Sequence, residues 1–170
     1  SSIPLVTLGT FLLWFGWFGF NGFSQLAMGT FDDVNAISKI AVNTHLAGAA
    51  GTVSAAVVSR LLGGKTDIIM MLNGALAGLV AITAEPLTPS PLLAIVIGAI
   101  GAIIMYFGTK FLEARHLDDV VGAIPVHMFA GIFGTLIVPI SNPDTNFGTQ
   151  FTGVISVCLF SFVLSYIIFK

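Results

Sequence analysis

Six long apolar stretches constrain the fold of this chain more than any other feature of its sequence. They run approximately over residues 3–28, 36–62, 67–84, 91–113, 121–140 and 148–169. The segments between them are polar or rich in helix breakers and are expected to be aqueous loops: 32–35, 63–67, 85–91, 113–119 and 141–150. A bilayer core about 30 Å thick is crossed by roughly 20 helical residues. The sequence therefore predicts an all-α, polytopic membrane protein with six transmembrane helices.

The composition excludes a soluble domain and argues against a nucleic-acid-binding protein. Hydrophobic residues make up 56% of the chain and charged residues 8%, and the mean hydropathy is +1.01. A soluble helical bundle needs polar outer faces, and residues 92–111 have almost none. Nucleic acid requires clustered Lys and Arg, whereas the net charge is −2 without any basic run. We therefore expect a lipid bilayer, and no nucleic acid, as the partner.

Lys and Arg are divided unequally between the two sides predicted by six spans. One side carries Arg60, Lys65, Lys110, Arg115 and Lys170, and the other carries Lys39. Short cytoplasmic loops of membrane proteins are enriched in these residues. The sequence thus predicts a multi-pass protein of the plasma (inner) membrane with the Lys170 end in the cytoplasm.

Small residues recur at spacings that bring helices into contact. The pairs are Gly48 and Gly51, Gly74 and Gly78, Gly98 and Gly101, and Gly131 and Gly134. Because lipid provides no hydrophobic drive between helices, close backbone approach stabilises their association. We interpret these glycines as packing residues that do not identify a substrate.

Two histidines are candidates for function because ionisable side chains inside a span are costly. His127 lies a few residues into the fifth stretch, and His45 lies nearer the outer third of the second. Neither has a nearby Cys, Asp or Glu in sequence, so no metal site is predicted. No cofactor and no covalent catalysis are expected either. A lone buried histidine without other context more often has a structural role, so the residues by themselves do not assign a function.

Aromatic and glycine residues alternate over residues 16–24, which read GWFGFNGFS. The glycines allow close packing or bending, and the rings can face a cavity. Ring faces attract cations, and a serine hydroxyl accepts hydrogen bonds, which suits a small cation with several donors such as ammonium. The same pattern also occurs in interfacial aromatic belts and in helix packing.

Four motifs in order resemble the Amt/Mep/Rh family of ammonium transporters. Residues 8–22 read LGTFLLWFGWFGFNG and resemble the signature around the sixth helix of that family. Residues 42–44 (VNT) and 71–83 (MLNGALAGLVAIT) resemble its seventh and eighth helices. Residues 118–135, with DD, GAIPVH and GIFGT, resemble its tenth. The resemblance covers nearly the whole chain.

The resemblance implies an eleven-helix protomer of two inverted repeats, in a homotrimer, with a hydrophobic pore in each protomer. Residues 1–170 are then the C-terminal half of an ammonium transporter domain, comprising the second repeat and the last helix. By position in the motifs, Ser24 and Phe20 recruit external ammonium, with methylammonium as an analogue. His127, Trp17 and Ala123 line the pore. Asp119 gives structural support, for which helix capping is the simplest reading.

The sequence departs from the family pattern at Phe23, Val120, Met128 and His45. Bulk at Phe23 and Met128, close to the proposed site, puts fast conduction in doubt. The runner-up function is therefore an ammonium sensor coupled to a cytoplasmic signalling domain, and a purely structural membrane segment is a third reading. A PII-type regulator is a possible partner of a transporter. We also expect that these residues form no working pore alone, since in such folds the conduit lies between two repeats.

Overall fold

The computed structural model describes residues 2–170 and contains only helices and connecting segments. The α-helices are α1 (Ile3–Gly22), α2 (Phe31–Gly63), α3 (Ile68–Thr83), α4 (Pro91–Ala114), α5 (Ala130–Ile137) and α6 (Phe147–Phe169). Short η1 (Phe23–Gln25) follows α1, and η2 (Ile124–Phe129) and η3 (Val138–Ile140) flank α5. The predicted all-α class is confirmed, and each of the six apolar stretches contains a helix.

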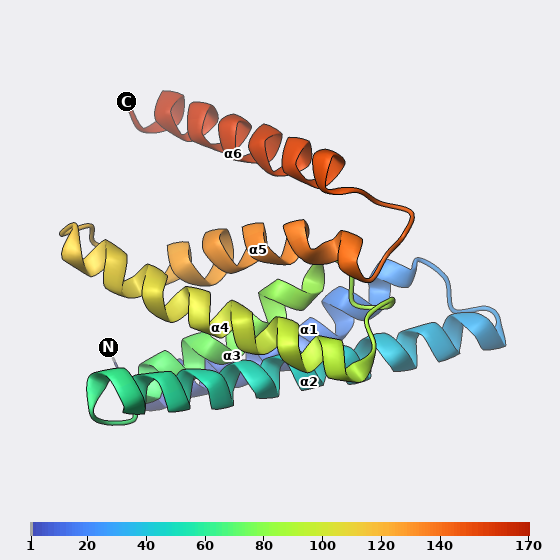
Figure 1. Cartoon of the computed structure of the whole chain (residues 1–170), viewed down its shortest axis with the longest axis horizontal. Coiled ribbons are helices and arrows are strands. Elements are labelled where there is room, and N and C mark those ends of the chain that lie inside the picture. Colours follow the sequence, from blue (N-terminus) through green and yellow to red (C-terminus); the bar gives the residue numbers. More distant parts are fainter. Residues whose placement is uncertain (1) are drawn as a thin grey trace.

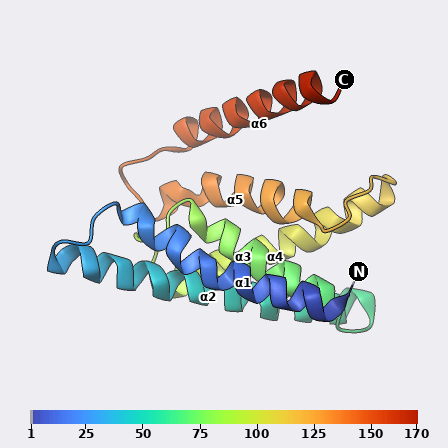
Figure 2. The same cartoon turned by 180° about the vertical axis from the view of Figure 1, so that it is seen from behind.

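The helices run alternately in opposite directions, as six successive spans require (Figure 1). The N-terminus, the α2–α3 connection, the α4–η2 connection and the C-terminus lie at one end of the molecule (Figures 1 and 2). The α1–α2, α3–α4 and α5–α6 connections lie at the other end. The predicted grouping of the loops into two sides is therefore present in the fold.

Four helices, α1 with η1, α2, α4 and α6, are long and apolar enough to cross a membrane. The other two apolar segments, Ile68–Thr83 and Ile124–Ile140, are shorter. At 1.5 Å per residue, the 16 residues of α3 extend about 24 Å. Eight of them are buried, so half of α3 is enclosed by its neighbours.

The start of α2 corrects one sequence prediction. Residues 32–35 were expected to form a loop, but the helix already begins at Phe31. Thr30 and Asp33 form a capping box, in which each side chain bonds the other residue's backbone N–H. Asp32 and Asp33 also lie where the positive end of the helix dipole favours acidic side chains. The polarity of this segment therefore marks a helix start.

Glycine contacts hold α2, α3 and α4 together at the centre of the fold. A Cβ atom at Gly51 would overlap the carbonyl of Gly74, and one at Gly98 would overlap the carbonyl of Ala47. Of the eight predicted packing glycines, seven leave no room for a Cβ; the exception is Gly131, whose Cβ would lie 3.6 Å from Val80. The packing interpretation is confirmed for those seven.

Helix α6 stands apart from the bundle and packs chiefly on α5 (Figures 1 and 2). None of its 23 residues is buried. The face of α5 and η2 that points toward α6 is consequently open over much of its length, and the candidate site lies there.

Candidate functional site

A cavity of about 680 Å³ separates α6 from η2 and α5. Its lining is mostly apolar. The polar or polarisable side chains that reach it are His127, Thr135, Cys158, Ser161 and Ser165. Met128, one of the residues that depart from the family pattern, also lines it and is 44% exposed. A largely apolar space with a few converging polar groups is typical of a small-molecule site or conduit.

His127 lies on the π-helical turn η2 and is exposed to this cavity. Its imidazole makes no side-chain hydrogen bond within residues 2–170. Pro125 lies in the first turn of η2, where a missing backbone N–H is tolerated. Single π-helical turns occur frequently at functional sites. Both ring nitrogens of His127 are thus available to whatever occupies the cavity.

Close contact with α4 shapes this turn. A Cβ atom at Gly108 would lie 2.8 Å from Phe129 Cε2 and 3.1 Å from the Cβ of Pro125. Gly108 therefore lets η2 approach the α4 backbone more closely than any other residue would. The position of His127 depends on this contact because Pro125 and Phe129 flank it on the same turn.

Asp119 holds the beginning of the same segment. Its Oδ1 and Oδ2 accept hydrogen bonds from the backbone N–H groups of Ala123 and Ile124, each 2.8 Å away. Gly122 turns the chain with a φ of +76°, a conformation that glycine adopts without strain. The Asn73 side chain donates to the carbonyl of Val121 at 3.3 Å, which joins α3 to this turn.

The other predicted site residues lie on α1 and η1. Ser24 is exposed, and its hydroxyl donates to the carbonyl of Phe20 at 3.1 Å. The Phe20 ring is 65% exposed and lies 5.9 Å from the Trp17 ring between centroids. Trp17 is half-buried, and its indole N–H donates to the Thr83 hydroxyl at 2.7 Å. These contacts bring Ser24, Phe20 and Trp17 into one group.

The site residues thus form two groups. Asp119, Ala123 and His127 are grouped at the start of η2, and Ser24, Phe20 and Trp17 are grouped at the end of α1. Only His127 among these six lines the large cavity.

The departures from the family pattern take different positions. A separate hollow of about 330 Å³ lies beside Phe23, which is 78% exposed. His45 stacks on Phe18, with ring centroids 6.2 Å apart, and lies 5.6 Å from the Trp14 ring. Val120 is exposed in the connection before η2. His45 therefore belongs to an aromatic contact between α1 and α2 and not to the cavity.

Several residues at these sites escaped the sequence reasoning. Thr83 and Gly108 act through partners far away in sequence, and only the fact that Thr83 is a polar residue ending a span hints at its role. The buried amides of Asn21 and Asn43 bond Thr44 and the carbonyls of the 86–89 turn, respectively. In the described residues, no group of three or more His, Cys, Asp or Glu side chains is placed to hold a metal ion.

Comparisons with known proteins identify the family of this chain. A sequence model described as Ammonium Transporter Family matches residues 1–170. Ammonium transporter Amt2 of Archaeoglobus fulgidus is 48% identical over 139 residues, which cover 82% of this chain and 29% of that protein. A putative ammonium transporter of Synechocystis sp. is 39% identical over 173 residues, covering 99% of this chain and 39% of that protein.

Solved structures show the same likeness. A structure named Sensor Amt Protein matches with a TM-score of 0.90 at 36% identity, covering 99% of this chain and 44% of that chain. The crystal structure of Candida albicans Mep2 matches with a TM-score of 0.89 at 26% identity, covering 99% of this chain and 40% of that chain. The chain therefore spans less than half the length of each of these relatives.

Proposed function

Because this chain belongs to the Ammonium Transporter Family, we propose that it forms one wall of a conduit that carries ammonium or ammonia across a membrane. The observation that carries the proposal is His127. Its imidazole is exposed to an apolar cavity of about 680 Å³ on the apolar helical segment Ile124–Ile140, with no hydrogen-bond partner in residues 2–170. An ionisable group in an apolar setting is costly, and such groups usually have a function.

The chemistry of the cavity favours separate handling of ammonia and the proton. An ammonium ion loses its hydration in an apolar space, at a cost that ring faces and a few hydroxyls do not offset. Neutral ammonia crosses such a space more easily, and an imidazole can donate or accept a hydrogen bond along the way. His127 would take this role, with Trp17 and Ala123 as further pore-lining positions.

We assign recruitment of ammonium to the group at the end of α1, which consists of Ser24, Phe20 and Trp17. The Ser24 hydroxyl donates to the Phe20 carbonyl, so its oxygen keeps lone pairs free to accept from a cation. The exposed Phe20 ring offers a π face beside it. This group lies at the end of the molecule away from the loops that carry most Lys and Arg, which supports an external position. The Lys170 end is then cytoplasmic.

The conduit needs a second wall. In the described residues, α6 alone faces η2 and α5 across the cavity, and none of its residues is buried. The chain also spans 29% to 44% of its relatives' lengths. We therefore propose that the other wall comes from protein outside these 170 residues, as in an inverted-repeat protomer, and that protomers assemble as a homotrimer. Purified residues 1–170 in liposomes should not conduct ammonium.

The proposal is tested by electrical recording of ammonium-driven currents from the full-length protein in proteoliposomes. His127→Ala should abolish the current or alter its selectivity for ammonium over methylammonium. His45→Ala is the matched control, because His45 lies outside the cavity, and it should conduct normally. Equal currents with equal selectivity from all three proteins would remove His127 from the conduit.

Ammonium sensing is the second candidate function. The likeness to Sensor Amt Protein, with a TM-score of 0.90, favours it, and the bulk of Phe23 and Met128 is consistent with slow passage. A sensor would bind ammonium with Ser24-dependent affinity and carry no current. Its output would pass to a fused signalling domain, whereas a transporter could instead be regulated by a PII-type protein.

A further inference from the structure

A third, smaller hollow lies at the loop end of α2, α3 and α4 and shares no lining residue with the His127 cavity. Its volume is about 170 Å³. The polar side chains that line it are Ser59, Lys65, Asp67, Tyr106 and Lys110. This end of the molecule carries five of the six Lys and Arg residues of the chain. Nothing in the proposed conduit uses these residues.

The hydroxyl of Tyr106 faces the hollow without a hydrogen-bond partner in the described residues. Tyr106 is only 5% exposed as a residue, and its hydroxyl makes no hydrogen bond within residues 2–170. The hydroxyl points to the space beside Gly63, where an added Cβ would lie 3.7 Å from it. The hydroxyl oxygen itself is open to the hollow, since it is not among the fully buried unpartnered side-chain atoms of the described residues, which are Asn21 Oδ1 and Asn43 Oδ1. The Tyr106 O–H is therefore a donor aimed into the hollow and bonded to no acceptor there.

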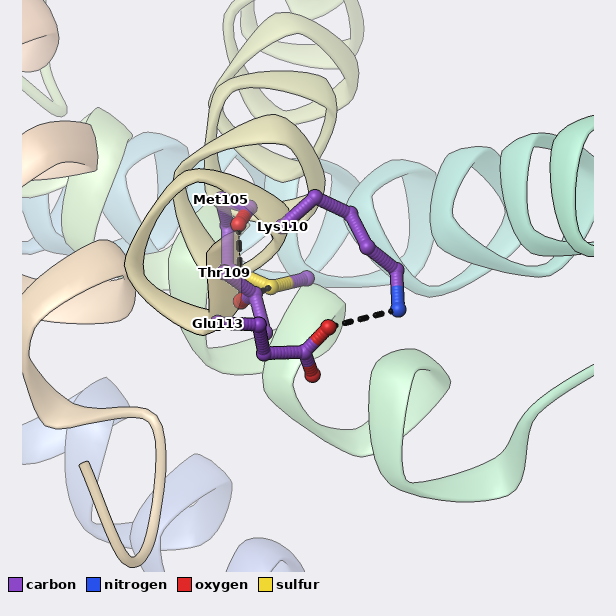
Figure 3. A network of polar contacts seen from close by, with 4 residues as sticks. All are labelled: Met105, Thr109, Lys110 and Glu113. Atoms are coloured by element: carbon purple, nitrogen blue, oxygen red, sulfur yellow. Dashed lines mark hydrogen bonds and ion pairs between the residues drawn. The ribbon is translucent and has the colours of Figure 1, made fainter. Parts of the chain in front are cut away.

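One oxygen of each nearby carboxylate is engaged, and Asp67 Oδ2 remains as an acceptor at the hollow. Asp67 Oδ1 accepts from the backbone N–H groups of Ile69 and Met70 at the start of α3. Glu113 pairs with Lys110 at 2.9 Å, as Figure 3 shows. That is the only ion pair within residues 2–170, so Lys65 has no acidic partner there. Donors at the hollow thus outnumber the free acceptors.

We propose that this hollow binds a phosphate group, and that its source is the headgroup of an anionic phospholipid. A phosphate oxyanion supplies the acceptors that Tyr106 and Lys65 lack, and Lys110 has further N–H donors beyond its bond to Glu113. Basic pockets between spanning helices at one membrane surface bind anionic headgroups in this way.

The surroundings favour a lipid over free phosphate. Phe107 and Phe111 on α4 are 54% and 49% exposed, and Leu62, beside Gly63, is 61% exposed. The Phe107 ring packs edge-on against Tyr106, with centroids 5.7 Å apart. An apolar surface therefore adjoins the donors directly, which is suited to acyl chains next to a bound headgroup.

The test is a titration of the purified full-length protein in neutral detergent with short-chain phosphatidylglycerol, followed by native mass spectrometry. Lys65→Gln should raise the dissociation constant about fivefold. Tyr106→Phe, which removes only the hydroxyl, should raise it about threefold or more. Lys39→Gln is the matched control, an exposed lysine at the other end of the molecule, and should leave it unchanged.

Competition with inorganic phosphate distinguishes the two possible sources of the phosphate group, which are a lipid headgroup and free phosphate. Displacement of the lipid by phosphate in the unmodified protein, weakened by Lys65→Gln, would support the proposal. Phosphate binding that depends on Lys65 without any such lipid binding would overturn the assignment to a lipid. Equal lipid affinity in all variants, or an equal loss with Lys39→Gln, would overturn the site itself. Lys65 is exposed, so its variant remains informative if Tyr106→Phe lowers thermal stability.

Discussion

The indole N–H of Trp17 donates to the hydroxyl of Thr83 across 2.7 Å, and this bond joins α1 to the last residue of α3. Thr83 in turn donates to the carbonyl of Leu79, one turn earlier in α3. The Trp17 ring also contacts Phe20. The orientation of the proposed recruitment group is therefore set by a buried, central helix and not by the exposed end of α1.

Replacing either partner of this bond should destabilise the protein. Trp17→Phe and Thr83→Val should each lower the free energy of unfolding by about 1 kcal/mol or more. The double variant should lose less than the sum of the two, because the shared bond is lost only once. Thermal unfolding in detergent measures all three. Strictly additive losses would show that the bond contributes nothing measurable.

Asp119 should matter for stability far more than its neighbour Asp118. Asp119→Ala removes the acceptor of two backbone N–H groups at the start of η2, for which we expect a loss of about 1–2 kcal/mol. Asp118 is exposed, and its carboxylate accepts no hydrogen bond within residues 2–170, so Asp118→Ala should change stability by less than about 0.5 kcal/mol. Unfolding midpoints of the two variants test this difference. Equal midpoints would argue against the capping role.

Gly108→Ala should disturb His127 without touching it. The added methyl group must displace Phe129 and Pro125, which flank His127 on η2. Overpacking of this kind costs about 1–3 kcal/mol. We expect lower ammonium current and altered selectivity, measured at a temperature where the variant is folded. Gly9→Ala is the matched control, because Gly9 is also a helical glycine, lies outside the cavity, and its added Cβ would meet no atom within 4 Å. A Gly108 variant with lower stability but normal selectivity would contradict the positioning role.

Ser24→Ala should weaken ammonium recruitment. The hydroxyl would accept one hydrogen bond from the cation, and its loss at an exposed site should raise the half-saturating ammonium concentration about three- to tenfold. Ser38 offers a close control, because its hydroxyl also donates to the carbonyl four residues earlier and is exposed. Ser38→Ala should leave the concentration dependence of the current unchanged. An identical response from both variants would place recruitment elsewhere.

The helices could be predicted from sequence because lipid imposes a length and a composition on each span. The last stretch, predicted at 148–169, is observed at Phe147–Phe169. Helix boundaries were harder to predict where polar residues cap a helix, because the same residues are also common in loops. Asp32 and Asp33 look like loop residues, but in the fold they belong to the first turn of α2. Hydrophobicity alone does not reveal that difference, whereas Thr30 three residues before Asp33 does.

The candidate site was predictable in its residue types and not in its geometry. Motif resemblance selected His127, yet no local pattern announced the π-helical turn that carries it. That turn depends on Gly108, which lies on α4 and contacts the turn only in the folded protein. Tyr106 likewise looks like one more aromatic residue of an apolar span. Its unpaired hydroxyl becomes visible only once α2, α3 and α4 are assembled around it.

The glycine contacts among α2, α3 and α4 make mutational tolerance asymmetric. At Gly51 the neighbouring atoms belong to the backbone of Gly74, which has no side chain that could rotate away. A glycine has no side chain to shorten, so a substitution at Gly51 can only add atoms, and the added atoms would overlap the neighbouring backbone. Random mutagenesis should therefore yield a region where even alanine is depleted among functional clones, while exposed positions of α6 outside the cavity, such as Leu159 and Phe160, exchange freely. Such a library would map the helix interfaces without a structure.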